Sequence, residues 1–322
     1  MQLSDPTSEN IEKKATRDGY GDALLELGAE NEKVVVLEAD LSGSTKTKPF
    51  SQKFPDRFFN FGVAEQNLVG HAAGMSRTGL IPFASSFAMF LTGRAWEVVR
   101  NTVVYAGENV KLVATHAGIT LGEDGASHQT IEDIAIMRVI PEMTVVVPAD
   151  YSQAFSAVKA AATYEGPIYI RLGRPGIPVI YNKDEKFEIG KGHVIQEGDK
   201  DTKIAFVSTG IMVYESWKAA RILEKETGKR PYVVNMPTIK PLDENLLKDL
   251  ASKVDIIYTF EEHNIIGGLG SAVSEYLCEF GNVRVKRIGI EDKFGQSGTV
   301  RILMQEYGLT AEKIVSRLKK EF

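Results

Sequence analysis

The sequence KLVATHAGITLGEDGASHQ, at residues 111–129, joins two patterns that together indicate an α/β fold. Its first residues, with Val110, form a short apolar segment that is typical of a buried strand. The segment that follows places two histidines and two acidic residues among three glycines. Glycine lets a backbone approach a ligand closely, and histidine and aspartate bind hydroxyls and phosphates. Because α/β proteins place their sites in loops after parallel strands, we predict a ligand-binding loop here.

Strand-like and helix-like segments alternate along the whole chain. Short β-branched runs predict strands at 34–37, 58–61, 81–84, 111–114, 144–147, 168–171, 204–208, 232–235, 255–260 and 283–288. Helical patterns lie between them, including a long one at 89–105. This alternation predicts two doubly wound α/β domains with mainly parallel sheets. The glycines, prolines and charges of 172–192 interrupt it, so we place a first domain at 1–178, a linker at 179–198 and a second domain at 199–322.

The composition is that of an ordinary globular protein, with 43% hydrophobic and 25% charged residues. A net charge of −5 argues against nucleic acid and anionic membranes as partners. The N-terminus lacks the apolar core of a signal peptide, and no stretch approaches the roughly 18 apolar residues of a membrane span. The single cysteine, Cys278, excludes an internal disulfide, and we expect it in the apolar core of a cytoplasmic protein.

Three motifs resemble the pyrimidine-binding domain of transketolases: FGVAEQN at 61–67, SFAMF at 86–90 and the loop at 115–129. The sequences EEHN at 261–264 and GGLG at 267–270 resemble the C-terminal domain of the same thiamine-diphosphate enzymes. The resemblance extends over essentially the whole chain. It implies two α/β domains and a thiamine diphosphate cofactor.

One departure from the transketolase pattern concerns the other half of the cofactor site. A complete transketolase has a preceding domain, marked by Gly-Asp-Gly and a downstream Asn pair, that holds a divalent metal and the diphosphate. This chain contains no Gly-Asp-Gly. It therefore resembles the C-terminal half of a split transketolase, without a metal site of its own. The resemblance implies an N-terminal transketolase subunit as partner, which holds Mg²⁺ and the diphosphate, in a heterotetramer with homodimer contacts.

By the same resemblance, four residues contact the cofactor: Glu65, Phe87, Phe90 and Asp40. Glu65 follows a strand and begins an apolar helix, so we expect apolar surroundings in which its carboxyl shares a proton with the pyrimidine ring. Phe87 and Phe90 lie on one helical face and would clamp that ring. Asp40 would support the cofactor contact. From the residues alone, Glu65 could equally be a first-turn helix acid and Asp40 a turn cap.

The substrate implied by the resemblance is a phosphorylated ketose or aldose, whose phosphate would be held by Arg17, Ser44, His116 and Arg174. A guanidinium suits phosphate because it donates in a fixed fork, although Arg17 could also be a solvated surface arginine. Arg171 competes with Arg174 for this role. Asp124 would hydrogen-bond the C2 hydroxyl of the sugar, and His128 would orient groups near the reacting carbon.

These assignments predict transfer of a two-carbon ketol unit from a ketose phosphate to an aldose phosphate, with Glu65, Asp124 and His128 as catalytic residues. Three alternatives remain. The first is a deoxyxylulose-phosphate synthase with pyruvate as donor, although that family lacks the set of His116, Asp124 and His128, as do the beta subunits of 2-oxo-acid dehydrogenases. The second is a non-catalytic assembly subunit. The third is a nicotinamide dehydrogenase, which rests only on the partial glycine motif at 268–270.

Overall fold

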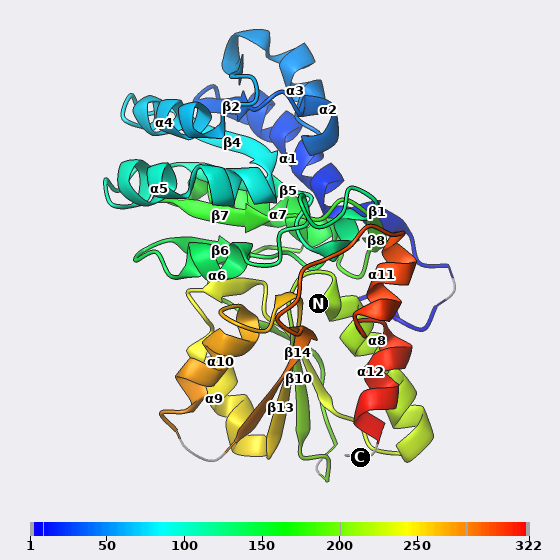
Figure 1. Cartoon of the computed structure of the whole chain (residues 1–322). Helices are drawn as coiled ribbons and strands as arrows, with labels where there is room; N and C mark the ends of the chain where they lie inside the picture. Colours follow the sequence, from blue (N-terminus) through cyan, green and yellow to red (C-terminus); the bar gives the residue numbers. More distant parts are fainter. Residues whose placement is uncertain (1–2, 9, 184, 200, 281–282, 320–322) are drawn as a thin grey trace.

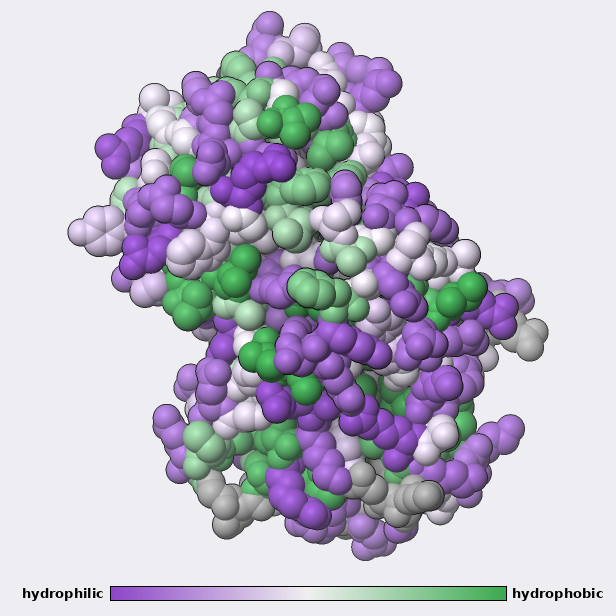
Figure 2. Space-filling view, viewed as in Figure 1, coloured by the Kyte–Doolittle hydropathy of each residue, from purple (hydrophilic) through white to green (hydrophobic). Residues whose placement is uncertain are grey.

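The computed structural model describes residues 3–8, 10–183, 185–199, 201–280 and 283–319 (Figure 1). Two β-sheets lie one above the other in Figure 1, each with helices on both faces. The face shown in Figure 2 is mostly polar, and small groups of apolar side chains gather near the level at which the two halves meet.

A seven-stranded sheet with the order β12-β6-β7-β5-β4-β2-β3 forms the upper half. Its members are β2 (Val34–Glu38), β3 (Phe58–Asn60), β4 (Ile81–Phe87), β5 (Lys111–Thr115), β6 (Thr144–Val146), β7 (Ile168–Arg171) and β12 (Thr238–Lys240). Neighbouring strands are parallel except at the edge, where β12 pairs antiparallel with β6. The central strands β7, β5, β4 and β2 are buried almost throughout, as strands between two helical layers require.

Helices cover both faces of this sheet. On one face, α1 (Thr16–Glu30) packs against α7 (Tyr151–Thr163), and on the other lie α4 (Glu65–Ser76) and α6 (Asp133–Arg138). The shorter segments are α2 (Ser42–Thr45), α3 (Lys48–Lys53), α5 (Trp96–Val98), η1 (Pro55–Arg57) and η4 (Ile119–Leu121). A two-stranded ribbon of β1 (Lys13–Ala15) and β8 (Gly176–Pro178) joins the beginning of this half to its end.

A five-stranded sheet with the order β14-β13-β10-β11-β9 forms the lower half. Its members are β9 (His193–Gln196), β10 (Ile204–Ser208), β11 (Tyr232–Asn235), β13 (Ile256–Asn264) and β14 (Arg284–Ile290). One face is covered by α8 (Met212–Thr227) and α12 (Ala311–Leu318), and the other by α9 (Glu244–Lys253) and α10 (Leu269–Leu277). The last connection contains α11 (Val300–Glu306), which packs against η4 of the upper half.

The predicted α/β class with mainly parallel sheets is confirmed, and every predicted strand overlaps an observed one. The helix predicted at 89–105 is instead two π-helical stretches, η2 (Met89–Arg94) and η3 (Val99–Val104), on either side of α5. The Thr92 hydroxyl in η2 donates to the carbonyl of Ala88 at 2.7 Å. A hydroxyl bonded in this way competes with the backbone for the same acceptor and disturbs the α-helical pattern.

Two strands lie where the sequence pattern does not indicate them. Within the segment 179–198, β9 adds an antiparallel edge to the lower sheet, and β12 crosses back to the upper sheet. Cys278 is also placed differently from our expectation. It is exposed at the end of α10, where Leu277 faces the core and the thiol donates to the carbonyl of Glu275 at 3.0 Å.

Candidate active site

The candidate site lies at the carboxyl ends of four neighbouring parallel strands in the upper sheet, β3, β2, β4 and β5. Asp40 follows β2, Glu65 follows β3, Phe87 ends β4 and His116 follows β5. Because parallel strands end at the same edge of a sheet, these four side chains share one rim. Arg17 joins them from the first turn of α1.

Glu65 is the first residue of α4 and is fully buried. Its Oε2 accepts a hydrogen bond from Nη1 of Arg94 at 2.7 Å, and its Oε1 accepts one from the hydroxyl of Ser86 at 3.2 Å. The expectation of apolar surroundings is therefore wrong, because η2 brings a guanidinium to the carboxylate. Both carboxylate oxygens are held in place by these contacts.

Arg94 is a candidate functional residue that the sequence pattern does not single out. Its side chain is 47% exposed, and its guanidinium lies 5.0 Å from the ring centroid of Phe90. It therefore connects the buried carboxylate of Glu65 to the aromatic part of the rim. A lone arginine beside a glycine gives no local signal, since its role depends on α4 and η2 being neighbours in space.

The two predicted phenylalanines belong to a row of four rings. Phe87 stacks on the imidazole of His116, with centroids 3.9 Å apart, and its centroid lies 6.5 Å from that of Phe90. Phe90 in turn meets His128 edge to face at 5.2 Å. Phe87 ends β4 and Phe90 lies in η2, so the expectation that the two share one helical face is wrong. The row nevertheless brings the two histidines of the 115–129 loop to both phenylalanines.

His116 has its backbone in the left-handed region (φ 63°) and is only 3% exposed. Its Nε2 lies 3.1 Å from Nη1 of Arg17, which can only donate, so Nε2 is the acceptor. The imidazole proton is therefore on Nδ1, which donates to the hydroxyl of Thr115 at 2.7 Å. Burial, with the nearby charges of Arg17 and Arg174, lowers the pKa of His116 to about 3, so the ring is neutral at pH 7.

Arg17, Ser44 and His116, to which the family resemblance gives a role in phosphate binding, lie in contact. The same Nη1 of Arg17 that bonds to His116 also donates to the backbone carbonyl of Ser44 at 2.9 Å. The Nε atom of Arg17 is buried and has no partner in the described part of the chain. A half-buried guanidinium with an unpaired N–H is suited to an anion.

Arg171 and Arg174 differ in accessibility, although only two residues separate them. Arg171 is buried, where it donates to Asp133 at 2.8 Å and to the backbone carbonyl of Glu262 at 2.9 Å. Arg174 is 39% exposed, donates to the carbonyl of Leu121 at 2.6 Å and lies 3.5 Å from the Glu123 carboxylate. Arg174 can therefore reach a ligand at the rim, whereas Arg171 is occupied by the junction between the two halves.

The remaining predicted residues are at the surface. Asp124 is exposed at the tip of the loop, and His128 is partly exposed with its Nδ1 3.0 Å from the Ser127 hydroxyl. Asp40 is exposed with φ 65°, and its carboxylate accepts from the amide of Asn60 at 3.0 Å. These groups face solvent around the buried part of the rim.

Glu38 is a second buried acid that the sequence pattern does not single out. It ends β2, accepts from the hydroxyl of Thr45 at 2.7 Å and from the backbone N–H of Leu41 at 2.5 Å. Burial raises the pKa of Glu38 to about 7, although both hydrogen bonds oppose this shift. The carboxyl fixes the turn that carries Asp40 and Ser44, so it organises the rim from below.

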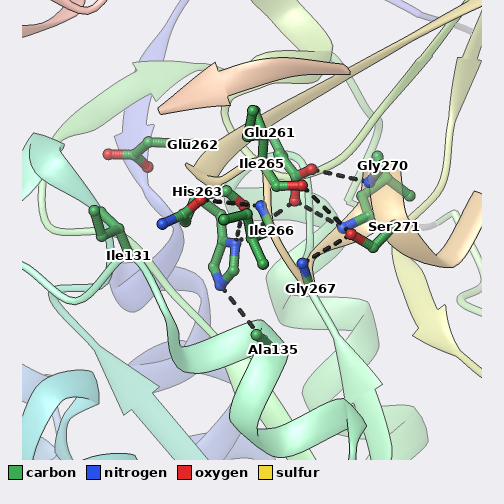
Figure 3. Close-up of polar contacts among 12 residues, drawn as sticks. Ile131, Ala135, Glu261, Glu262, His263, Ile265, Ile266, Gly267, Gly270 and Ser271 are labelled. Carbon is green, nitrogen blue, oxygen red and sulfur yellow. Dashed lines mark hydrogen bonds and ion pairs between the residues drawn. The ribbon is translucent and has the colours of Figure 1, made fainter. Parts of the chain in front are cut away.

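The glycine motif before α10 is a packing feature. The carboxylate of Glu261 accepts from the backbone N–H groups of Leu269 (2.7 Å) and Gly270 (2.9 Å), the helix end where a dinucleotide phosphate would bind (Figure 3). A Cβ on Gly268 would lie 1.9 Å from the same carboxylate. The glycines let an acid of the same chain cap the helix, which contradicts the dehydrogenase alternative.

Among the described residues, no group of three or more His, Cys, Asp or Glu side chains is arranged to hold a metal ion. None of their helices combines the length and apolar character needed to cross a membrane.

Residues 12–178 match the family described as transketolase, pyrimidine binding domain, and residues 190–314 match transketolase, C-terminal domain. The chain is 52% identical to a putative transketolase C-terminal section from Methanocaldococcus jannaschii, over 96% of each chain. It is similar to a solved split gene transketolase described as an inactive beta4 tetramer, with 52% identity and a TM-score of 0.87 over 95% of this chain and 97% of that one. It is also 36% identical to rat transketolase, over 98% of this chain but 50% of the rat protein.

Proposed function

This chain belongs to the transketolase family, and we propose that it is the C-terminal subunit of a split, thiamine-diphosphate-dependent transketolase. The observation that carries the proposal is the convergence of a buried carboxylate, an aromatic row and an Arg17–His116 contact on one rim. Similarity to a separate C-terminal section, and to half of a full-length transketolase, supports the split arrangement.

The rim has the chemical groups that a cofactor pyrimidine requires. Glu65 offers a buried carboxylate for a ring nitrogen, and Phe87 and Phe90 offer flat apolar surfaces beside it. Asp40 stands at the exposed end of the same rim. When bound, thiamine diphosphate would supply a nucleophilic carbon that takes up the two-carbon unit. The Glu65 carboxylate would hold a proton at the pyrimidine ring. That ring would have to replace Arg94 as the partner of one carboxylate oxygen of Glu65.

The substrate would be held by its phosphate and its hydroxyl groups. Arg17 and the Ser44 segment would form one side of a phosphate clamp, and Arg174 would close it from the loop side. His116 would contribute by holding the Arg17 guanidinium through its Nε2 atom. His116, neutral with its proton on Nδ1, would leave the positive charge to the two arginines. Asp124 would accept a hydrogen bond from the C2 hydroxyl of the sugar, and His128 would orient groups near the reacting carbon.

Assembly would proceed through two kinds of contact. Residues Gln66, Asn67, Gly70, His71 and Gly74 of α4 line an open groove, and a Cβ on Gly70 or Gly74 would meet no atom within 4 Å. This helix face lets a second copy approach closely, which supports a homodimer contact here. The rim would face the N-terminal subunit, which would carry Mg²⁺ and the diphosphate. We place the assembled enzyme, a heterotetramer of two chains of each kind, in the cytoplasm.

The test is ketol transfer by the purified chain with and without a partner chain that carries the diphosphate-binding domain, in the presence of Mg²⁺ and thiamine diphosphate. We expect activity with a ketose phosphate and an aldose phosphate only in the mixture. Turnover by this chain alone would refute the split arrangement. Activity of the mixture with pyruvate in place of the ketose would instead favour the synthase alternative, and an inert mixture would favour an assembly subunit.

A further inference from the structure

The 115–129 loop, which carries His116, Asp124 and His128, is held in place by the lower half of the molecule. Glu262, near the end of β13, accepts a hydrogen bond from the backbone N–H of Thr120 at 2.6 Å. A Cβ on Gly118 would lie 2.3 Å from the Glu262 carboxyl, so this glycine is needed for the close approach. Glu262 therefore fixes the first half of the loop.

The second half of the loop contacts the segment 294–298, which is part of the connection between β14 and α11. The amide nitrogen of Gln129 donates to the carbonyls of Gly122 and Gln296, each at 3.0 Å, and so ties the loop to this segment. The Ser297 hydroxyl donates to the carbonyl of Glu123. The peptide that joins Glu123 to Asp124 is thereby attached to the lower half.

The segment itself is anchored at both ends. The Tyr307 hydroxyl donates to the carbonyl of Phe294 at 2.8 Å, and Thr299 caps α11 by accepting from the N–H of Ile302. A Cβ on Gly295 would lie 1.9 Å from Oε1 of Gln129, so the segment and the loop meet without space for a side chain. The segment can therefore act as a fixed platform under the tip of the loop.

We infer that Ser297 is a positioning residue for Asp124, through which the second half of the chain sets the geometry of acceptor binding. The inference rests on the proposed ketol transfer. The Ser297 hydroxyl holds the carbonyl immediately before Asp124, while Arg174 holds the carbonyl of Leu121 on the other side of the turn. Without the hydroxyl, the peptide can rotate and move the Asp124 carboxylate away from the sugar hydroxyl that it accepts from.

The test compares two acceptors in the assembled enzyme, an aldose phosphate with a C2 hydroxyl and its 2-deoxy counterpart. We expect Ser297→Ala to lower kcat/KM for the hydroxylated acceptor about 3- to 10-fold, the effect of one misplaced hydrogen bond, and to leave the 2-deoxy acceptor unchanged. Ser297→Thr keeps a hydroxyl and should restore the wild-type ratio of kcat/KM for the hydroxylated acceptor to kcat/KM for the 2-deoxy acceptor. Ser252→Ala removes another exposed hydroxyl that donates to a backbone carbonyl, on α9, and serves as the matched control.

An equal loss for both acceptors, or no loss, would overturn the positioning role of Ser297. The failure of the proposed function has a different signature. In that case the wild-type assembly transfers no ketol unit to either acceptor, so kcat/KM cannot be measured for either of them. A wild-type enzyme that prefers the hydroxylated acceptor, together with an unchanged ratio in Ser297→Ala, would leave the proposed function intact and remove only this inference.

Discussion

The buried and exposed parts of the candidate site differ in what they already contact. Glu65 and His116 are buried, and each makes two hydrogen bonds within the chain. Asp40 and Asp124 are exposed, and His128 is partly exposed. The buried part is therefore preorganised by this chain alone, whereas the exposed part presents groups that a ligand or a second surface can meet. We expect substitutions in the buried part to affect every reaction, and those in the exposed part to affect particular substrates.

The largest expected effect is that of Glu65→Gln, which tests whether the buried part carries the chemistry. Glutamine keeps the shape of the side chain but cannot exchange a proton with the pyrimidine ring. We expect kcat of the assembled enzyme to fall by about 10²–10⁴ with every donor. Glu108→Gln is a matched control, because Glu108 is also a buried acid paired with an exposed arginine, Arg77. Activity of Glu65→Gln close to that of this control would assign Glu65 a structural role.

Arg171→Met tests whether the buried arginine stabilises the fold, in contrast to the partly exposed Arg174. Removing this guanidinium leaves Asp133 and Glu262 buried without their partner. Breaking a buried pair in this way costs about 3–5 kcal/mol of unfolding free energy, which denaturant titration of the chain would measure. Arg174→Ala, at the partly exposed arginine, should change this free energy by less than about 1 kcal/mol. Equal losses in the two variants would contradict the different roles that the structure gives these arginines.

Arg174→Ala should act on the substrate instead. A charge-assisted hydrogen bond contributes roughly 1.5–3 kcal/mol, so kcat/KM for a ketose phosphate should fall about 10–150-fold. Hydroxypyruvate has no phosphate and does not make the lost bond. Its kcat/KM should therefore remain within about 2-fold of wild type. A parallel loss with both donors would show that Arg174 holds the loop rather than the phosphate.

His116→Asn tests the buried part of the site through the pH dependence of the unfolding free energy. The pKa of His116 is lowered to about 3 in the folded chain, so below pH 6.5 the unfolded chain binds a proton that the folded chain does not. The neutral ring therefore contributes to stability above pH 6.5, and this contribution is lost as the pH falls towards 3. The loss is at most about 1.4 kcal/mol for each pH unit. Unfolding free energies between pH 7 and pH 4.5 should fall less steeply in the variant, and identical slopes would contradict a neutral, buried His116.

The strands, and the edge at which their loops meet, could be predicted because β-branched runs and parallel order are local features. The family resemblance brought Arg17 and His116 together, because Arg17 comes from the first turn of α1 and not from the end of a strand. The pairing of Glu65 with Arg94 and the bond from Ser297 to Glu123 could not be predicted, because they depend on the packing of segments that are distant in sequence. The difference between Arg171 and Arg174 has the same origin, since only the position of Asp133 and Glu262 shows which arginine is occupied.

The family resemblance assigned most of the rim, but it did not indicate how the two halves are joined. The strand pattern suggested a boundary at 179–198, and β9 lies inside that segment. An edge strand of three residues such as β12 is too short to leave a periodic pattern, so its return to the upper sheet is visible only in the structure.

The position of β12 has a consequence for how the chain can fold during synthesis. The upper sheet receives its outermost strand from residues 238–240, so a nascent chain that has emerged only as far as 178 leaves the free edge of β6 uncovered. That edge is available for pairing with other chains until residues 238–240 have emerged from the ribosome. Truncation at the apparent boundary would make this temporary state permanent, so an excised first half should aggregate where the whole chain does not.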